Sequence, residues 1–244
     1  MKKGESGKPE LSVIISALNE EKVVEPLLIK VLGILKKSRI NAEIVFMDDH
    51  STDSTGKIVD KISEKDRRIR VIHRKGKVGS EKGGVGNSIR DGFRNARGNY
   101  VLYMDCDSHN PKYIPLFFKH REDADIIIGS RFIKGGSAEM PFSRWIATGS
   151  FNLLLKFLFN WHLRDFTSGY KLYSKKMLDK IKIESKGFGI HAEVPLKALV
   201  LGYKIKEIPI HYDKSYKKST LNYKREFVSY IQPVILALKM KLGF

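Results

Sequence analysis

Short apolar segments alternate with helical segments from residue 11 to about residue 130, and this alternation constrains the fold more than any other feature. The apolar segments are continuous and rich in β-branched residues, which is typical of buried strands. The predicted strands are 11–18, 42–47, 69–73, 99–104 and 124–130. Between them, apolar residues recur at helical spacing. The pattern predicts an α/β fold built on a parallel, doubly wound sheet.

Polar segments follow three of the predicted strands directly. They are "NEE" at 19–21, "DDHSTD" at 48–53 and "DCDSH" at 105–109. Parallel sheets bind ligands outside the carboxyl ends of their strands. We therefore expect these segments to converge on one crevice.

The strand–helix pattern changes after residue 140. A long helix with many aromatic residues is predicted at 142–161, and a last, amphipathic helix at 223–244 contains Pro233. The length suits one domain. The predicted organisation is a disordered tail (1–10), a single domain (11–221) and a C-terminal amphipathic helix (222–244).

The chain is strongly basic, with 45 Lys and Arg against 27 Asp and Glu and a formal net charge of +18. This balance favours an anionic partner: a nucleic acid, a lipid surface or a phosphorylated substrate.

No apolar segment reaches the roughly 18 to 20 uncharged residues of a spanning helix. The N-terminus lacks the apolar core of a signal peptide. A single cysteine, Cys106, excludes an intramolecular disulfide. We expect a cytoplasmic protein.

Asp105 and Asp107 follow the fourth strand and form a D-x-D pattern. Residues two apart on an extended segment point to the same side, so the two carboxylates repel each other unless a cation intervenes. Mg²⁺ takes oxygen ligands and shares them with phosphates. The alternative is an Asx-type turn that caps the helix at Pro111. His109 is a candidate third ligand, more suited to Mn²⁺, or an exposed turn residue.

Other charged residues occupy comparable positions. Asp48 and Asp49 end the second strand. In dinucleotide-binding folds an acidic residue at this position binds a ribose or base. The alternative is that these residues cap the next helix. Arg131 ends the fifth strand and could hold a phosphate with two hydrogen bonds. Arg144 and Lys214 extend this cationic set. Asp165 is a candidate general base or an architectural residue.

Five segments together resemble glycosyltransferase family 2. Within that family the chain is most similar to polyprenyl-phosphate glycosyltransferases such as dolichol-phosphate mannose synthases. The segments are "LSVIISALNEE", "IVFMDDHSTDST", "YVLYMDCDSHNPKYIP", "ADIIIGSRFIKGG" and "DFTSGYKLYSKKML". The resemblance extends from about residue 11 to 221.

The resemblance implies a GT-A fold, a nucleotide-sugar donor and a divalent metal, Mg²⁺ or Mn²⁺. It implies that Asp105 and Asp107 hold the metal and diphosphate, with His109 where relatives often carry glutamine. The backbone of Cys106 would pass the donor. Arg131 and Arg144 match arginines expected to bind substrate phosphates. The residues implied to line the nucleoside pocket are Ser16, Leu18, Glu20, Met47 and Asp49.

Two departures from the family pattern concern Ser16, where proline is common, and the acceptor loop "DKSYKKSTL", where Lys214 replaces an arginine. The favoured reaction is inverting transfer of mannose from GDP-mannose to a polyprenyl phosphate. A lipid phosphate is already ionised and needs no strong base. The catalytic candidates are Asp107, Arg131 and, for a hydroxyl acceptor, Asp165.

The basic surface favours peripheral contact with the cytoplasmic face of a membrane, with helices 142–160 and 223–244 in the interface. Packing against the domain or a subunit is the alternative role for these helices. One alternative function is transfer from a UDP-sugar to a sugar hydroxyl. Another is a basic nucleic-acid-binding module, which leaves the paired carboxylates unexplained, so we expect no nucleic acid among the partners.

Overall fold

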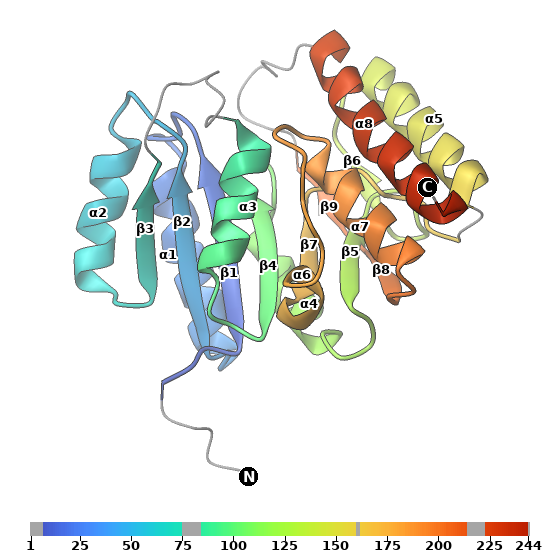
Figure 1. Ribbon diagram of the computed structural model, residues 1–244. Helices are drawn as coiled ribbons and strands as arrows, with labels where there is room; N and C mark the ends of the chain where they lie inside the picture. The colour runs from blue at the N-terminus through green and yellow to red at the C-terminus, as the bar shows by residue number, and fades with distance from the viewer. Residues whose placement is uncertain (1–6, 75–83, 160–161, 214–222, 244) are drawn as a thin grey trace.

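The computed structural model describes residues 7–74, 84–159, 162–213 and 223–243, and in the last range it describes side chains from residue 228 onward. Among these residues a seven-stranded sheet has the order β3-β2-β1-β4-β7-β5-β8 (Figure 1). Its strands are β1 (Leu11–Ala17), β2 (Ala42–Asp48), β3 (Ile69–His73), β4 (Tyr100–Asp105), β5 (Ile126–Ser130), β7 (Lys171–Ser174) and β8 (Ile205–Pro209).

One strand runs against the others. β7 lies between β4 and β5 and pairs antiparallel with both, with Lys171 opposite Tyr103 and Ile128. The other neighbouring strands pair in parallel. The carboxyl ends of β1, β2, β4 and β5 and the amino end of β7 therefore share one edge of the sheet. The predicted mostly parallel α/β sheet is confirmed, but β5 does not pair with β4.

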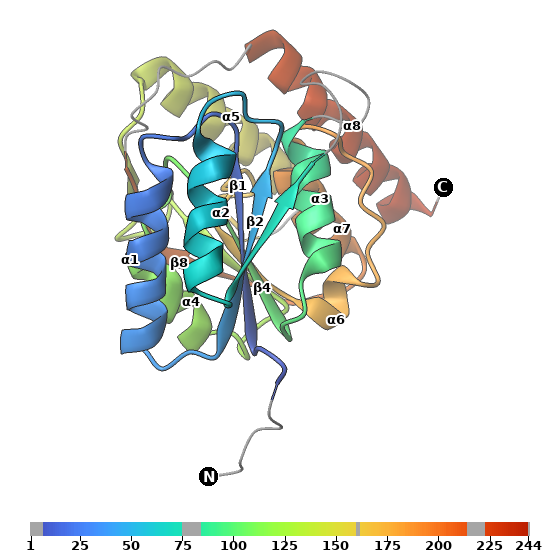
Figure 2. The same cartoon turned by 90° about the vertical axis from the view of Figure 1, so that its left-hand side faces the viewer.

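Helices cover both faces of the sheet, as Figure 2 shows. The helices on one face are α1 (Val24–Lys37), α2 (Thr55–Lys65) and α4 (Ile114–Lys119), which follows the 3-10 turn η1 (Pro111–Tyr113). Those on the other face are α3 (Val85–Asn95), α6 (Lys175–Leu178) and α7 (Ile190–Val200).

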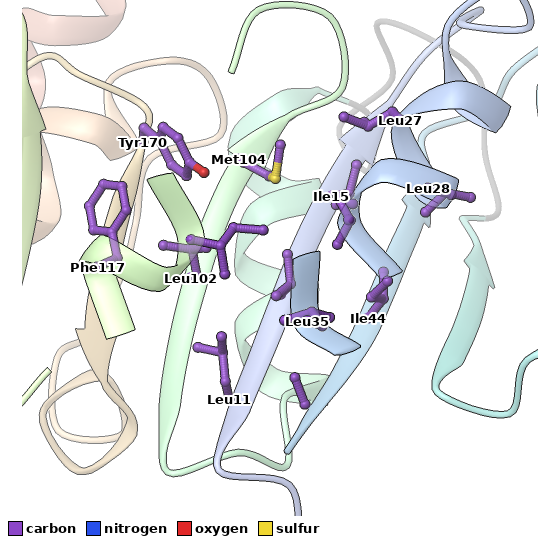
Figure 3. Close-up of a cluster of buried hydrophobic side chains, with 14 of the residues drawn as sticks. Leu11, Ile15, Leu27, Leu28, Leu35, Ile44, Leu102, Met104, Phe117 and Tyr170 are labelled. Carbon is purple, nitrogen blue, oxygen red and sulfur yellow. The ribbon is translucent and has the colours of Figure 1, made fainter. Parts of the chain in front are cut away.

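The core has two layers because alternate strand residues point to opposite faces. Ile15, Leu102 and Phe117 belong to the cluster beneath α1 and α4, shown in Figure 3. Ile14 and Tyr103 belong to the cluster beneath α3 and α7. Burial of each large apolar side chain contributes roughly 1.5–3 kcal/mol relative to exposure. Both faces are apolar, which explains the continuous apolar runs in the sequence.

Two long helices lie side by side beyond the sheet (Figure 1). They are α5 (Phe142–Phe159) and α8 (Tyr223–Leu242), and both pack on α7 through a third apolar cluster. Leu155, Ala192 and Ala237 are fully buried in it. A two-stranded sheet, β6 (Ser137–Ala138) with β9 (His211–Tyr212), completes this end. In the described part of the chain, no helix is both long and apolar enough to cross a membrane. Residues 1–6 of the predicted tail lie outside the described residues.

Candidate functional site

The loops after β1 and β2 are tied together at the carboxyl edge of the sheet. Asn19 adopts a positive φ of 57°, and its side-chain oxygen accepts a hydrogen bond from the Thr52 backbone N–H at 2.7 Å. The Glu20 N–H donates to the Thr55 hydroxyl at 2.7 Å. These bonds fix the two loops that were predicted to surround the donor nucleoside.

The predicted nucleoside residues differ in accessibility. Leu18 is exposed, and Ser16 shares a hydrogen bond with Ser88 beneath α3 at 2.9 Å. Asp49 is buried and accepts a hydrogen bond from the Arg74 guanidinium. Met47 is 0 % exposed and packs in the core beneath α3, so it does not line a surface that a ligand reaches.

Asp105 ends β4 and is held by two neighbours. The Tyr103 hydroxyl donates to its Oδ1 at 2.5 Å, and its own backbone N–H donates to His109 Nδ1 at 2.8 Å. Burial and the nearby Asp107 carboxylate raise the pKa of Asp105 to about 6, although the Tyr103 hydrogen bond opposes this. Its side chain remains 26 % exposed. Cys106 turns to the opposite face and packs in the core with Met104.

This pair of carboxylates fits a hard divalent cation. A cation would relieve the repulsion that raises the Asp105 pKa, and a diphosphate and water would complete its oxygen ligands. Within residues 7–74, 84–159, 162–213 and 223–243, no group of three or more His, Cys, Asp or Glu side chains is arranged around a metal position. Asp105 and Asp107 would therefore be the protein's contribution.

His109 requires a correction to the predicted ligand set. Its Nδ1 lone pair already accepts the Asp105 N–H, so the ring proton of the neutral imidazole lies on Nε2. Burial lowers the pKa of His109 to about 3, which keeps the ring neutral. The ring stacks on Tyr170 with centroids 4.8 Å apart. Neither ring nitrogen is left to bind a metal, and His109 instead shapes the turn after β4.

The raised Asp105 pKa predicts a gain in stability for Asp105→Asn. Because the folded-state pKa of about 6 exceeds the ordinary aspartate value of 3.8, its stability contribution is complete below pH 4 and is lost as the pH rises through 6. At pH 8 without metal, the variant should be more stable by about 1–3 kcal/mol. Mn²⁺ with nucleotide should raise the melting temperature of the wild type but not of the variant. Thermal unfolding at pH 4 and pH 8 measures both effects, and equal stability at pH 8 would contradict the prediction.

Arg131 and Asp165 form a buried ion pair. Arg131 donates to Asp165 from Nε at 2.8 Å, from Nη2 at 2.7 Å and from its backbone N–H at 2.9 Å. Burial alone would raise the pKa of Asp165, but the guanidinium holds it below its usual value. Asp165 is 0 % exposed. A buried carboxylate with a lowered pKa is a poor general base, so the geometry gives Asp165 an anchoring role instead.

The loop before β7 reaches this edge because β7 is antiparallel. Lys171 is fully buried, and its ammonium group donates to the backbone carbonyls of Phe166, Ser168 and His191. Burial lowers the pKa of Lys171 to about 7. The lysine thus fastens the loop that carries Gly169 to the first turn of α7.

A pocket of about 280 Å³ lies between this edge and the two long helices. Asp105 borders it on the sheet side, and Arg131 and Arg144 provide positive charge. Arg144 is close enough to Asp105 to lower the pKa of that carboxyl. The remaining lining residues are His109, Ala147, Thr148, Phe151, Thr167, Gly169, Phe188, His191, Tyr212 and Tyr230. Lys214, predicted to extend the cationic set, lies outside the described residues.

Sequence reasoning missed most of the pocket wall. Phe151 and Tyr230 come from α5 and α8 and meet with ring centroids 5.4 Å apart. His191 and Glu193 both lie in the first turn of α7. That glutamate is buried and accepts from the ammonium group of Lys197 at 2.6 Å, which makes it architectural. The sequence signal that could have indicated His191 is the segment "GFGIH" at 187–191, which places a histidine just after two glycines at the start of a helix.

Comparison with known proteins identifies the family. The model of the family described as "Glycosyl transferase family 2" matches residues 12–182. The chain belongs to glycosyl transferase family 2. This family 2 glycosyltransferase is 33 % identical over 187 residues to an undecaprenyl-phosphate mannosyltransferase from Micrococcus luteus, covering 73 % of this chain and 75 % of the relative. It is 31 % identical over 208 residues to a polyprenol monophosphomannose synthase from Mycolicibacterium smegmatis, covering 81 % and 75 %.

A third relative is longer. A dolichol-phosphate mannosyltransferase from Pyrococcus furiosus is 29 % identical over 205 residues, which cover 82 % of the glycosyltransferase described here and 55 % of the relative. Among solved structures, glucosyl-3-phosphoglycerate synthase from Mycobacterium tuberculosis, in complex with Mn²⁺, uridine diphosphate and phosphoglyceric acid, superposes with a TM-score of 0.68. The identity is 19 %, and the match covers 97 % of this chain and 79 % of the other. This likeness confirms the GT-A fold.

Proposed function

We propose that this glycosyltransferase transfers mannose from a nucleotide sugar, GDP-mannose being the favoured donor, to a polyprenyl phosphate at a membrane surface. One observation carries the proposal. A single pocket joins a carboxylate suited to a metal-bound diphosphate, Asp105, to two guanidiniums suited to a second phosphate, Arg131 and Arg144. The named activities of the relatives from Micrococcus and Mycolicibacterium support this choice of sugar and acceptor.

The donor would bind at the carboxyl ends of β1, β2 and β4. Asp105 and Asp107 would hold a divalent cation, which when bound supplies positive charge to the departing diphosphate. The uridine diphosphate and Mg²⁺ or Mn²⁺ in the structural relatives support a metal for the fold in general. The fixed loops around Asn19 and Thr52 border the same edge, where the nucleoside would lie.

The acceptor phosphate would bind at the opposite side of the pocket. Two hydrogen bonds to Asp165, from Nε and Nη2, fix the Arg131 guanidinium, and its Nη1 makes no hydrogen bond to the residues that the structure describes. Arg144 lines the same pocket from the first turn of α5. Fixed positive charge here reduces the repulsion between two anionic substrates and costs no reorganisation during the reaction.

The reaction needs no proton transfer. An ionised oxygen of the acceptor phosphate attacks the anomeric carbon, and the bond from that carbon to the diphosphate oxygen breaks with its electron pair leaving on the diphosphate. Attack from the opposite side inverts the anomeric centre. The commitment of Asp165 to Arg131 agrees with this chemistry, because a hydroxyl acceptor would require a free base in the pocket.

The direct test is a transfer assay with the wild-type chain, Mn²⁺ or Mg²⁺, and a panel of GDP- and UDP-sugars. Polyprenyl phosphate and simple sugars serve as alternative acceptors. We expect mannosyl transfer from GDP-mannose to polyprenyl phosphate only. Transfer to a sugar hydroxyl, or no transfer to polyprenyl phosphate from any donor, would overturn the proposal.

Arg144→Ala should weaken binding of the acceptor more than binding of the donor. Loss of one charge-assisted contact to phosphate should raise the KM for polyprenyl phosphate about 10- to 100-fold. The KM for the donor should change less than the KM for polyprenyl phosphate, because Arg144 acts on Asp105 only through its charge but would contact the acceptor phosphate directly. Lys156→Ala, on the same helix but outside the pocket lining, is the matched control. Equal changes in the KM for polyprenyl phosphate in the two variants would contradict the role of Arg144 in binding the acceptor.

We infer that the outer surfaces of α5 and α8 contact the membrane. On α5, Trp145 is 48 % exposed and Phe157 is 84 % exposed, unusually high values for large apolar side chains. Leu153 on α5 and Ile235 on α8 are also exposed. The same helices line the pocket, so a membrane at this surface would present a lipid phosphate next to Arg144. The net charge of +18 would add attraction to an anionic leaflet.

Leu153→Ser combined with Phe157→Ser should reduce binding to vesicles that contain anionic phospholipid by about tenfold or more, because two large side chains no longer enter the bilayer. Ile29→Ser is the matched control, since Ile29 on α1 is 60 % exposed but lies away from these helices. Vesicle sedimentation measures the change. Unchanged vesicle binding by the double variant would place the membrane contact elsewhere.

A further inference from the structure

His191 is a buried polar side chain that the proposed reaction has not yet used. It is the second residue of α7, is 4 % exposed and lines the pocket. Its ring nitrogens form no hydrogen bond with any residue in the described part of the chain. The imidazole lines the pocket and has no hydrogen-bond partner among the described residues, so it is available to a group that enters the pocket.

The orientation of the imidazole is fixed from two sides. The ammonium group of Lys171 donates to the backbone carbonyl of His191 at 3.1 Å. The ring packs against Tyr103 with centroids 5.5 Å apart and against Phe188 with centroids 6.2 Å apart. Tyr103 is also the donor to Asp105. The imidazole is therefore held on the same aromatic residue that positions the proposed metal ligand.

Gly169 allows Asp105 and His191 to approach the same part of the pocket wall. A Cβ atom at this glycine would lie 3.3 Å from Asp105 Oδ2 and 3.4 Å from His191 Cε1. It would also lie 3.1 Å from His109 Cε1. These groups pack closely around residue 169, so a side chain there would crowd Asp105 and His191 where both line the pocket.

The imidazole is neutral in this setting. Burial lowers the pKa of His191 well below its usual value, and the positive charge of Lys171 adds to this effect. A neutral imidazole offers one N–H donor and one lone-pair acceptor. That combination complements a hydroxyl group, which also donates and accepts, better than it complements a phosphate, which needs donors alone.

We propose that His191 hydrogen-bonds a hydroxyl of the transferred hexose and thereby contributes to the choice of sugar. The inference rests on the proposed function, in which the hexose lies between the diphosphate at Asp105 and Asp107 and the acceptor phosphate at Arg144. His191 lines the same pocket as Asp105 and Arg144. It is a specificity-determining residue that touches the donor sugar but neither the nucleoside nor the metal.

The test compares His191→Phe, which keeps a planar ring without nitrogen, with His191→Gln, which keeps a donor and an acceptor. His162→Phe, at an exposed position, is the control. Calorimetry with Mn²⁺ gives the affinity for GDP, which lacks the sugar. Steady-state assays give kcat/KM for GDP-mannose and GDP-glucose with polyprenyl phosphate as acceptor. Thermal unfolding reports whether each variant is folded.

His191→Phe should bind GDP within about twofold of the wild type but lose about 10- to 100-fold in kcat/KM for GDP-mannose. Its preference for mannose over glucose should narrow at least about fivefold, and His191→Gln should recover part of both. A purely structural role would lower GDP affinity or thermal stability instead of selectivity. If the phenylalanine variant does not fold, the selectivity of the glutamine variant decides.

Two negative results are distinguishable. Unchanged selectivity in both variants, with active wild-type enzyme, overturns the role of His191 and leaves the proposed function intact. Equal losses of GDP and GDP-mannose affinity likewise overturn it, because His191 would then act on the nucleotide. Absence of sugar transfer by the wild type with every donor overturns the proposed function and this inference together.

Discussion

Asp107→Ala is expected to abolish metal-dependent nucleotide binding and to lower sugar transfer by about a thousandfold or more. Asp107 and Asp105 would supply the protein ligands of the cation, and Asp107 is close enough to raise the pKa of Asp105. Without it, the charge that develops on the departing diphosphate loses several kcal/mol of stabilisation, and each 1.4 kcal/mol is about tenfold in rate. Calorimetry of GDP binding with and without Mn²⁺, together with the transfer assay, measures both effects.

Asp179→Ala is the matched control for this substitution. Asp179 follows α6, is largely exposed and pairs with Lys175, far from the carboxyl edge of β4. It should leave binding and transfer unchanged. Asp107→Ala should also gain no measurable stabilisation from Mn²⁺ with nucleotide, since a ligand stabilises only the state that binds it. Metal-dependent nucleotide binding that survives in Asp107→Ala would remove Asp107 from the proposed metal site.

Asp165→Ala is expected to destabilise the protein by about 3–5 kcal/mol, the usual cost of leaving one member of a buried ion pair without its partner. For a chain of this size that corresponds to a fall of about 6–20 °C in the melting temperature. Arg131 would lose three hydrogen bonds to the carboxylate and remain charged inside the protein. Thermal or denaturant unfolding measures the loss.

Asp66→Ala is a useful comparison because Asp66 also pairs with an arginine, Arg68, but at the surface. Exposed pairs contribute at most about 1 kcal/mol, so this variant should unfold almost as the wild type does. Asp165→Asn separates anchoring from catalysis. An anchor predicts a stability loss and a weaker acceptor KM, whereas a general base predicts a large loss of kcat at unchanged stability. The second pattern would contradict the role given to Asp165.

The sequence was sufficient to predict the sheet edge and the segments that meet there. Buried strands are short and continuous in apolar residues, and the polar residues after β1, β2 and β4 have no place in that core. The position of Asp105 at this edge follows from the same argument, because Asp105 ends β4 and β4 pairs with β1. Parallel topology then brings Ser16 and Asp105 into register.

Other features depend on contacts between residues far apart in sequence. Nothing local in "KLYS" indicates that β7 inserts antiparallel between β4 and β5. Asp165 pairs with Arg131, which is 34 residues away in the sequence. This pairing could not be predicted from the sequence, so the general-base interpretation of Asp165 stayed open. His109 looked like a ligand because its spacing was suitable. The backbone hydrogen bond that occupies its Nδ1 appears only when the turn is folded.

The part of the chain before β5 and the part after it, which includes the antiparallel β7, contribute different sides of the site. Residues before Pro111 build the edge assigned to the donor, whereas eleven of the thirteen residues that line the pocket come from Arg131 onward. Substitutions in the second half can thus alter the acceptor or the sugar while the residues assigned to the nucleotide stay unchanged. We expect chimeras joined between β5 and α5 to keep the nucleotide of the first parent and take the acceptor of the second. A joint at this position would allow lipid or sugar acceptors to vary while the part of the chain assigned to the nucleotide stays the same.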